Sequence, residues 1–329
     1  MKAGHPYIVY FPNIIYCYLK QNGVGMKNST HIRGPKKHER TVVSASAYML
    51  SKMAFHIAPN KMARLMREKG FAIKPFHLSA GQRGLLQQAQ SFYLEFNHNR
   101  IKVFEWGAGP VILLVHGWGG RALQLDAFIT ALLSNGYKVV AFDQKGHGES
   151  SSRFSSYPEI VRSTDLVAAH YANELHGVVA HSIGANSMFK VSENFGRKLK
   201  IAAVAPVDNF LGVLENMRMK LGIYEKLFVQ VIRNIETECG LLLSELDVLD
   251  YEKISRHDVL LVHDKFDRVN NISASHAIHK NLPGSSLMQT EKLGHSRLLG
   301  NREVIDRVVA HFTACGLGSE SRSLPPVPE

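Results

Sequence analysis

Short apolar runs recur through the middle and the C-terminal part of the chain. They are rich in β-branched residues, and each is separated from the next by a segment long enough for a helix. The runs are Val111–Val115, Val139–Phe142, Val178–Ala180, Ile201–Val204 and Val259–Val262. Continuous apolar runs are typical of strands that are buried on both faces. The pattern therefore predicts an α/β fold, with a mostly parallel central sheet and helices on both faces.

A different pattern precedes these runs. Phe92, Leu94 and Phe96 alternate with polar residues, turn-forming residues follow at 97–99, and the alternation resumes at Ile101. Period-two alternation around a turn predicts a β-hairpin.

The connection between Val207 and Val259 is longer than a single helical crossover. Its roughly 50 residues predict two or three helices, which would form a small cap inserted at about 208–257. Most of its apolar residues are explained as the buried faces of those helices. A cap rich in Met and Leu would also place an apolar wall over a site beneath it, which favours an acyl or alkyl group over a sugar or phosphate.

The N-terminal part of the chain differs from the rest in composition and in hydrophobic pattern. Residues 27–45 are polar, basic and turn-rich, which predicts a disordered lead-in. Ala47–Lys69 has apolar residues at helical spacing, a break at Pro59 and basic residues between. Two short helices that pack on the domain are the favoured interpretation. The alternative is a basic amphipathic surface that contacts a membrane or covers the mouth of the active site.

The expected organisation is a basic N-terminal extension (1–90), partly disordered and then helical. A domain with the helical cap (91–315) and a disordered C-terminal tail (316–329) follow. Tyr7–Leu19 is apolar, but its 13 residues are too few for a spanning helix, which needs about 20. It also makes a weak signal peptide without a cleavage site, and an alternative is that translation begins at Met26.

The net charge of +11 is unevenly distributed. Residues 1–100 carry 15 Lys/Arg against 3 Asp/Glu, whereas the remaining residues carry 24 against 25. Since the basicity is confined to the extension, nucleic-acid binding is not predicted. The cysteines, Cys17, Cys239 and Cys315, are odd in number, far apart and without zinc-ligand spacing. They predict reduced thiols, no metal site and a cytoplasmic protein.

Ser182 is the predicted nucleophile. The apolar strand Gly177–His181 runs directly into it, and a helix-compatible stretch follows, which is the context that gives a G-x-S-x-G pattern its meaning. The residues two before and two after such a serine must be small. Gly184 fits, and Ala180 replaces the usual first glycine with another small residue.

A serine nucleophile needs a base, and His295 is the predicted one. It follows the last strand-like run, Ser286–Gln289, and the ends of parallel strands are where such sheets present functional groups. The other candidates have structural explanations. His116 and His147 belong to turns, His181 is expected to point away along its strand, and His263 and His311 are expected to be packing or surface residues.

The acid that orients the base should come from another strand end. Asp267, just after Val259–Val262, is the predicted acid, and Asp264 and Asp208 remain alternatives. The chain order Ser182, Asp267, His295 is the order of the α/β-hydrolase triad.

Acyl transfer also needs N–H donors for the developing oxyanion. The N–H of Ile183, next to the nucleophile, is one predicted donor. The N–H of Trp118, in the glycine-rich turn His116–Gly120, is the other.

These motifs together resemble those of the α/β-hydrolase superfamily, in particular its small bacterial serine hydrolases. The resemblance rests on His116–Gly120, Asp143–Ser150 and Ala180–Ala185, and covers roughly residues 92–313. It implies a hydrolase without cofactor, most often an esterase, in which the Asp143 motif is a structural turn. The serine excludes relatives that use aspartate or cysteine as nucleophile.

The function expected from the sequence is hydrolysis of carboxylic esters with apolar acyl chains, through an acyl-enzyme on Ser182. The expected partner is a small-molecule ester, with no nucleic acid and no integral membrane segment. A thioesterase or a C–C bond hydrolase would use the same triad. A non-catalytic member of the fold that binds a small molecule is the remaining alternative.

Overall fold

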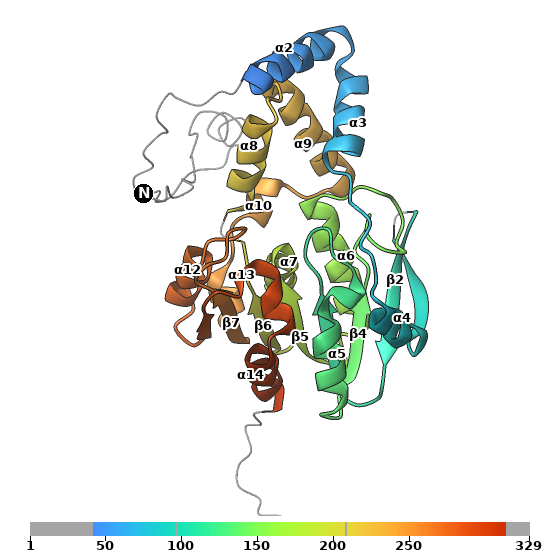
Figure 1. The fold of residues 1–329 in the computed structure, drawn as a ribbon, viewed down its shortest axis with the longest axis vertical. Helices are drawn as coiled ribbons and strands as arrows, with labels where there is room; N and C mark the ends of the chain where they lie inside the picture. The colour runs from blue at the N-terminus through green and yellow to red at the C-terminus, as the bar shows by residue number, and fades with distance from the viewer. Residues whose placement is uncertain (1–41, 97, 208, 314–329) are drawn as a thin grey trace, which may run out of the picture.

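The computed structural model of the chain describes residues 42–96, 98–207 and 209–313 (Figure 1). The predictions for Tyr7–Leu19, Met26, Cys17, Cys315, Asp208 and the tail 316–329 lie outside these residues.

The strands are β1 (Gln90–Phe96), β2 (Asn99–Trp106), β3 (Val111–Val115), β4 (Lys138–Phe142), β5 (Leu175–His181), β6 (Lys200–Val204), β7 (Asp258–Asp264) and β8 (Ser286–Thr290). The longer helices are α2 (Val42–Ile57), α3 (Pro59–Gly70), α4 (Ala80–Gln87), α5 (Asp126–Leu133), α6 (Tyr157–His170), α7 (Ile183–Ser192), α8 (Phe210–Lys220), α9 (Glu225–Cys239), α12 (Ser273–Asn281) and α14 (Arg302–Thr313). The one-turn helices are α10 (Leu243–Leu246), α11 (Tyr251–Ile254), α13 (Gly294–Arg297), η1 (Ala122–Leu125) and η2 (Leu298–Gly300).

The strands form one eight-stranded sheet in the order β1-β2-β4-β3-β5-β6-β7-β8. The hairpin strand β1 pairs antiparallel with β2, and β2 pairs antiparallel with β4. All further pairings, from β4 through β8, are parallel. The predicted parallel sheet and the predicted hairpin are both confirmed.

Alternate residues of the central strands enter two separate cores, one on each face of the sheet. Val178 and Ala180 of β5 pack in the core that contains α6 and α7, whereas Val179 packs in the core with α5 and α14. All three side chains are fully buried. Burial on both faces explains why these strands have continuous apolar sequences.

Four helices, α8 to α11, occupy the described part of the connection between β6 and β7. The sequence predicted two or three, because α10 and α11 are single turns without a periodic pattern of their own. Helix α9 buries Leu227, Val231 and Ile235, which recur at helical spacing. These side chains belong to the same core as α6 and α7, so the inserted helices are anchored on that face of the domain.

Helices α2 and α3 lie beside α8 and α9 at one end of the molecule (Figure 1). The hydroxyl of Tyr48 donates to Glu225 Oε2 at 3.0 Å, and Ser51 Oγ accepts from the N–H of Tyr224 at 2.9 Å. The interpretation of this segment as two helices that pack on the domain is confirmed. Because α2 already begins at Val42, the prediction of disorder for residues 42–45 was wrong.

A buried carboxylate connects α3 to the domain. Glu159 of α6 accepts from Arg67 Nη2 at 3.0 Å and also pairs with Lys145, while its second oxygen accepts from the hydroxyl of Ser156 at 2.8 Å. Its side chain is only 5% exposed. Removing one member of such a group leaves the other charges in a poorly solvated position, which is costly.

The variant Glu159→Ala is therefore expected to lower the free energy of unfolding by about 3 kcal/mol. Urea denaturation followed by circular dichroism measures this change. Glu68→Ala is the matched control, because Glu68 is exposed on the same helix as Arg67 and forms no ion pair among the described residues. The control should shift stability by no more than about 0.5 kcal/mol. Equal effects of the two variants would contradict the assigned role of Glu159.

Candidate active site

Ser182 lies in a sharp turn between β5 and α7, with φ 55° and ψ −130°. A positive φ is uncommon for a residue with a side chain, so the surroundings must hold it. A Cβ atom at Gly184 would come 2.5 Å from the carbonyl oxygen of His116, which explains the need for glycine. Ala180 is fully buried and accommodated. The turn predicted from the sequence is present, including its alanine.

Asp267 and His295 are in direct contact. His295 Nδ1 donates to Asp267 Oδ2 at 2.7 Å, and the Asp267 carboxylate is fully buried. Its other oxygen accepts from the N–H groups of Val269 and Asn270 at 2.7 and 2.9 Å. Burial by itself raises the pKa of Asp267, but hydrogen bonds from His263 and His295 outweigh it and hold the pKa well below its usual range. The carboxylate is thus ionised at neutral pH.

Asp264, the alternative acid, has a different role. Its carboxylate accepts from the hydroxyl of Thr290 at 2.8 Å and from the N–H of Leu293 at 2.9 Å. Burial acts to raise its pKa, but these hydrogen bonds lower it. Asp264 therefore shapes the loop after β8 that carries His295, whereas Asp267 contacts the imidazole itself.

The Ser182 hydroxyl has a partner that the sequence did not predict. Its Oγ accepts from Asn270 Nδ2 at 3.3 Å, and the same amide donates to the carbonyl oxygen of Ala205 at 2.8 Å. No hydrogen bond joins Ser182 to His295 in the described part of the chain. Catalytic hydrogen bonds are often long before a substrate binds. Asn270 follows Asp267 by three residues, and only the tertiary contact distinguishes it from other loop asparagines.

Two further histidines lie near the expected base and its acid, and His181 differs from its predicted role. His181 was expected to point away along its strand, yet its ring lies 4.7 Å from the ring of His295, and its Nε2 contacts the His295 carbonyl at 3.2 Å. His263 is fully buried, 3.5 Å from Asp267 Oδ2 and 3.1 Å from the carbonyl of Asn270. His263 thus helps to hold both the acid and Asn270.

The glycine-rich turn after β3 is held by two neutral imidazoles. His116 Nε2 accepts from the N–H of Gln144 at 2.9 Å, and His147 Nε2 accepts from the N–H of Gly119 at 3.1 Å. Each Nδ1 lies within hydrogen-bond distance of a carbonyl, at 2.7 Å for His116 and 3.0 Å for His147. The predicted turn role of both histidines is confirmed.

Asp143 holds backbone groups close to the glycine-rich turn. Its fully buried carboxylate accepts from the N–H groups of Ala122 and Glu149, both at 2.8 Å. A Cβ atom at Gly148 would collide with this carboxylate at 1.9 Å. The backbone N–H groups of Trp118 and Ile183, the predicted oxyanion donors, make no hydrogen bond to another described residue.

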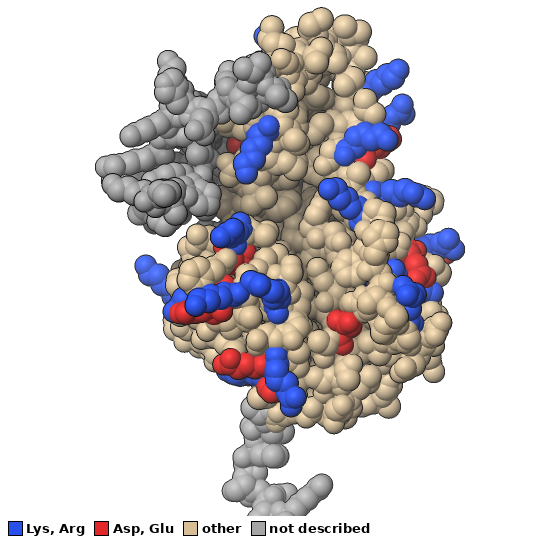
Figure 2. Space-filling view, viewed as in Figure 1, with Lys and Arg blue, Asp and Glu red and all other residues tan. Residues whose placement is uncertain are grey.

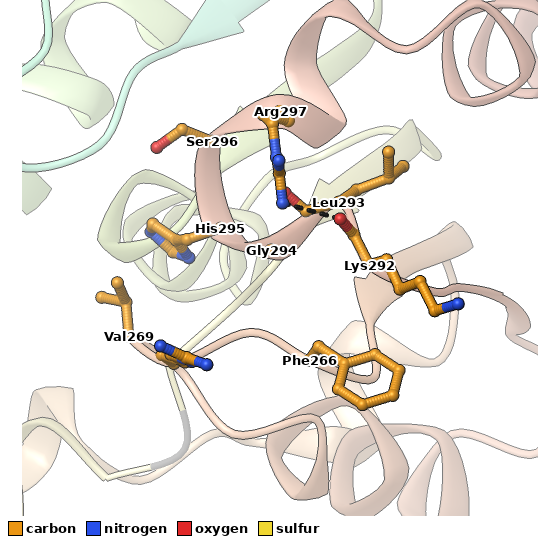
Figure 3. A pocket seen from close by; sticks show the side chains of 9 residues that line it. Phe266, Val269, Lys292, Leu293, Gly294, His295, Ser296 and Arg297 are labelled. Atoms are coloured by element: carbon orange, nitrogen blue, oxygen red, sulfur yellow. Dashed lines mark hydrogen bonds between the residues drawn. The ribbon is translucent and has the colours of Figure 1, made fainter.

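A pocket of about 600 Å³ opens beside His295. Figure 3 shows Val269 and Phe266 on one side of it and the loop from Lys292 to Arg297 on the other. Arg297 is turned back onto its own loop, where it donates to the carbonyl oxygens of Lys292 and Leu293 at 2.6 and 2.7 Å. No group of three or more His, Cys, Asp or Glu side chains that could hold a metal ion occurs among the described residues.

Comparison with known proteins identifies the fold that carries these residues. Residues 108–235 match the family model described as serine aminopeptidase, S33. The matched range includes Trp118 and Ser182. An esterase from Pyrococcus furiosus has a similar structure, with a TM-score of 0.54 and 14% identity over 73% of this chain and 96% of that chain. A bacterial membrane phospholipase A has a TM-score of 0.53 and 17% identity, covering 80% and 94%. The chain has an α/β-hydrolase fold.

Curated relatives of this chain match over shorter segments. A non-heme haloperoxidase from Rhodococcus erythropolis is 32% identical over 92 residues, which cover 28% of this chain and 30% of the relative. A bifunctional esterase/perhydrolase from Acinetobacter calcoaceticus is 31% identical over 94 residues, with the same coverage. Matches to the first three curated relatives span only 30% to 41% of their lengths.

The buried histidines of the chain make its stability depend on pH. Burial lowers the pKa of His116 to about 4, and those of His147 and His181 to about 3. In the unfolded chain each pKa is about 6.5, so below that pH the unfolded state binds more protons. We expect the free energy of unfolding to be largest above about pH 6.5 and to fall by about 1.4 kcal/mol per pH unit for each histidine as the pH drops toward 4.

Urea denaturation at pH 7.5, 6.0 and 5.0 measures this dependence. An unfolding free energy that stays constant or rises as the pH falls over this range would contradict it.

Proposed function

We propose that the chain is a serine hydrolase that cleaves carboxylic esters with apolar acyl groups through an acyl-enzyme on Ser182. The observation that carries the proposal is the 2.7 Å hydrogen bond from His295 Nδ1 to the buried carboxylate of Asp267. It leaves Nε2 of a neutral His295 free to accept a proton. Ser182, Asp267 and His295 follow the ends of β5, β7 and β8, three parallel strands of the same sheet.

In the first half of the proposed reaction, Ser182 Oγ attacks the ester carbonyl carbon while its proton passes to His295 Nε2. The imidazolium is stabilised by the ionised Asp267. The carbonyl oxygen becomes an oxyanion, and the N–H groups of Trp118 and Ile183 are the donors proposed to bind it. Collapse of this intermediate breaks the bond to the alcohol oxygen, which takes the proton from His295 as the alcohol leaves.

In the second half, a water molecule attacks the acyl carbon and transfers a proton to His295. The bond to Ser182 Oγ then breaks, the serine recovers its proton from His295, and the carboxylic acid departs. Asn270 is proposed to hold the serine hydroxyl before the substrate arrives, since its amide reaches Oγ at 3.3 Å. The hydroxyl would exchange this weak contact for one with His295 when the substrate binds.

The surroundings of the site support an apolar substrate. Phe266, Val269 and Leu293 line the pocket beside His295. Phe266 and Val269 are exposed, at 56% and 68% of their surfaces, so an apolar group bound there would remove them from water. Two relatives, the esterase/perhydrolase and a protein phosphatase methylesterase from Bos taurus, carry ester-cleaving names. A small-molecule ester is therefore the proposed partner.

A cytoplasmic location is part of the same proposal. The single cysteine within the described residues, Cys239, forms no disulfide, and burial raises the pKa of its thiol to about 11. A thiol of this kind is unreactive and suits a reducing compartment.

Labelling with a fluorophosphonate probe tests the nucleophile. The wild-type chain should be labelled at Ser182, and Ser182→Ala should abolish both labelling and the hydrolysis of p-nitrophenyl esters. Ser187→Ala is a matched control on the following helix, because Ser187 is a buried serine whose hydroxyl hydrogen-bonds to Thr164 and to the carbonyl of Gly184. Folded wild-type protein that takes up no probe would instead indicate a non-catalytic binding protein. Turnover of acyl-CoA thioesters but not of oxygen esters would reject the proposed substrate class.

Exchanging the two acids for amides tests the assignment of Asp267. Asp267→Asn is expected to lower kcat by roughly 10⁴-fold, the effect known for the corresponding change in a serine protease, because His295 loses its orienting anion. Asp264→Asn should lower the unfolding free energy, since its carboxylate holds the β8 loop, but reduce kcat of the folded enzyme by less than about tenfold. Ester hydrolysis with p-nitrophenyl butyrate gives kcat, and urea denaturation gives stability. The reverse ranking of the two kcat values would make Asp264 the acid.

A further inference from the structure

We propose that the outward face of helix α2 docks on the surface of an anionic phospholipid bilayer. This face, called the apolar tip below, consists of Met49, Leu50, Met53 and Ile57. The inference goes beyond ester hydrolysis and does not depend on the chemistry at Ser182. It begins from an arrangement that is unusual for a surface helix, whose outward residues are normally polar.

The apolar tip is a continuous stripe of exposed side chains at helical spacing. The exposed fractions are 59% for Met49, 66% for Leu50, 60% for Met53 and 80% for Ile57. The opposite face of α2 is already occupied, because Tyr48 and Phe55 pack on Tyr224 with ring centroids 5.7 Å apart in both cases. Packing on the domain therefore does not account for the apolar residues that point outward. Clustered exposed apolar residues of this kind mark interaction surfaces.

Basic side chains accompany the apolar tip. Lys52, Lys61, Arg64 and Lys69 are exposed on α2 and α3, and Glu68 is the one acidic residue of the two helices. None of Lys61, Arg64 and Lys69 takes part in an ion pair with another described residue. Figure 2 shows few charged side chains at the end of the molecule that carries α2, and Lys and Arg side chains gathered beside it along α3. An apolar end next to basic residues matches an interface helix, which buries apolar residues among lipids and places cations at the headgroups.

Charge selects the bilayer over a second copy of the chain. A symmetric dimer through the apolar tip would bring two sets of the same basic side chains together, and like charges repel. Anionic headgroups complement them instead. Within the described residues no helix is long and apolar enough to cross a membrane, and α2 has only 16 residues, so the contact we propose lies in the plane of the interface.

Docking through α2 would also set the position of α9 relative to the lipid surface. Helices α2 and α3 pack directly on α9, which belongs to the connection between β6 and β7. The ion pair of Arg67 with Glu159 fixes α3 to the domain, so the orientation of the apolar tip relative to the domain is defined. Binding at the tip would thus orient the whole molecule on the surface.

Vesicle co-sedimentation of the full chain tests the proposal. The vesicles are phosphatidylcholine alone, and phosphatidylcholine with 30% phosphatidylserine. The wild type should bind the anionic vesicles at least tenfold more tightly than the neutral ones, and 0.5 M NaCl should remove most of this difference. Met53→Ser/Ile57→Ser should weaken binding to the anionic vesicles at least tenfold. The matched control is Val213→Ser/Val248→Ser, which removes two valines that are exposed to 48% and 67% on the inserted segment. This control should bind like the wild type.

A second variant separates the contribution of charge. Lys61→Gln/Arg64→Gln should bind neutral and anionic vesicles equally, and circular dichroism together with fluorophosphonate labelling checks that each variant is folded. The proposal is overturned if wild-type protein does not sediment with anionic vesicles, or if the valine control loses as much binding as the tip variant. It is also overturned if sedimentation velocity shows a wild-type dimer that the tip variant abolishes, since the tip would then be an interface between copies of the chain.

Discussion

The strained turn at Ser182 is the constraint on which the rest of the site depends. Its positive φ is held because three strands meet around it. The N–H of Ser182 donates to the carbonyl of Val204 in β6 at 2.8 Å, and Gly184 presses against the carbonyl of His116 after β3. Since these contacts come from the sheet itself, the serine is positioned by the most rigid part of the molecule. The strain is local, and the parallel sheet supports it.

Histidine side chains surround the turn at Ser182 and the residues that contact it. His116 and His147 each accept one backbone N–H through Nε2, which fixes the glycine-rich loop that contains Trp118. His263 contacts Asp267, and His181 lies beside His295. An imidazole can accept at one nitrogen and donate at the other only while it is neutral. Burial lowers the pKa of His116 to about 4 and that of His147 to about 3, which maintains this arrangement in the glycine-rich loop. The site and the pH response of the fold share one physical cause.

The N-terminal helices are attached to the domain on one side and expose apolar residues on the other. Through Tyr48, Ser51 and Arg67 they are attached to α9 and α6 by polar contacts, while the apolar residues of α2 point outward. Helix α2 thus has aromatic and polar contacts on its inner face and exposed apolar residues on its outer face. Apolar residues on both faces explain why the sequence pattern of Ala47–Lys69 fitted both packing on the domain and contact with a membrane. The packing interpretation applies to the inner face, and the proposed membrane contact concerns the outer face.

Local sequence was sufficient for the sheet and for the turn at Ser182. The apolar runs predicted the parallel strands because burial on both faces demands continuous hydrophobicity, and Gly184 marked the turn because no larger residue fits there. Asp267 was the predicted acid, but Asp264 remained an alternative, since both follow β7 and only the fold decides which carboxylate reaches His295. Asn270, His181 and His263 were missed for the same reason. Their roles arise from contacts between residues far apart in the chain, such as Asn270 with Ser182, and no periodicity or spacing records a contact of that kind. The sequence by itself determined which backbone the chain adopts, and the tertiary structure decided which polar side chains meet, because hydrogen bonds depend on ångström-scale distances that only the packed sheet sets.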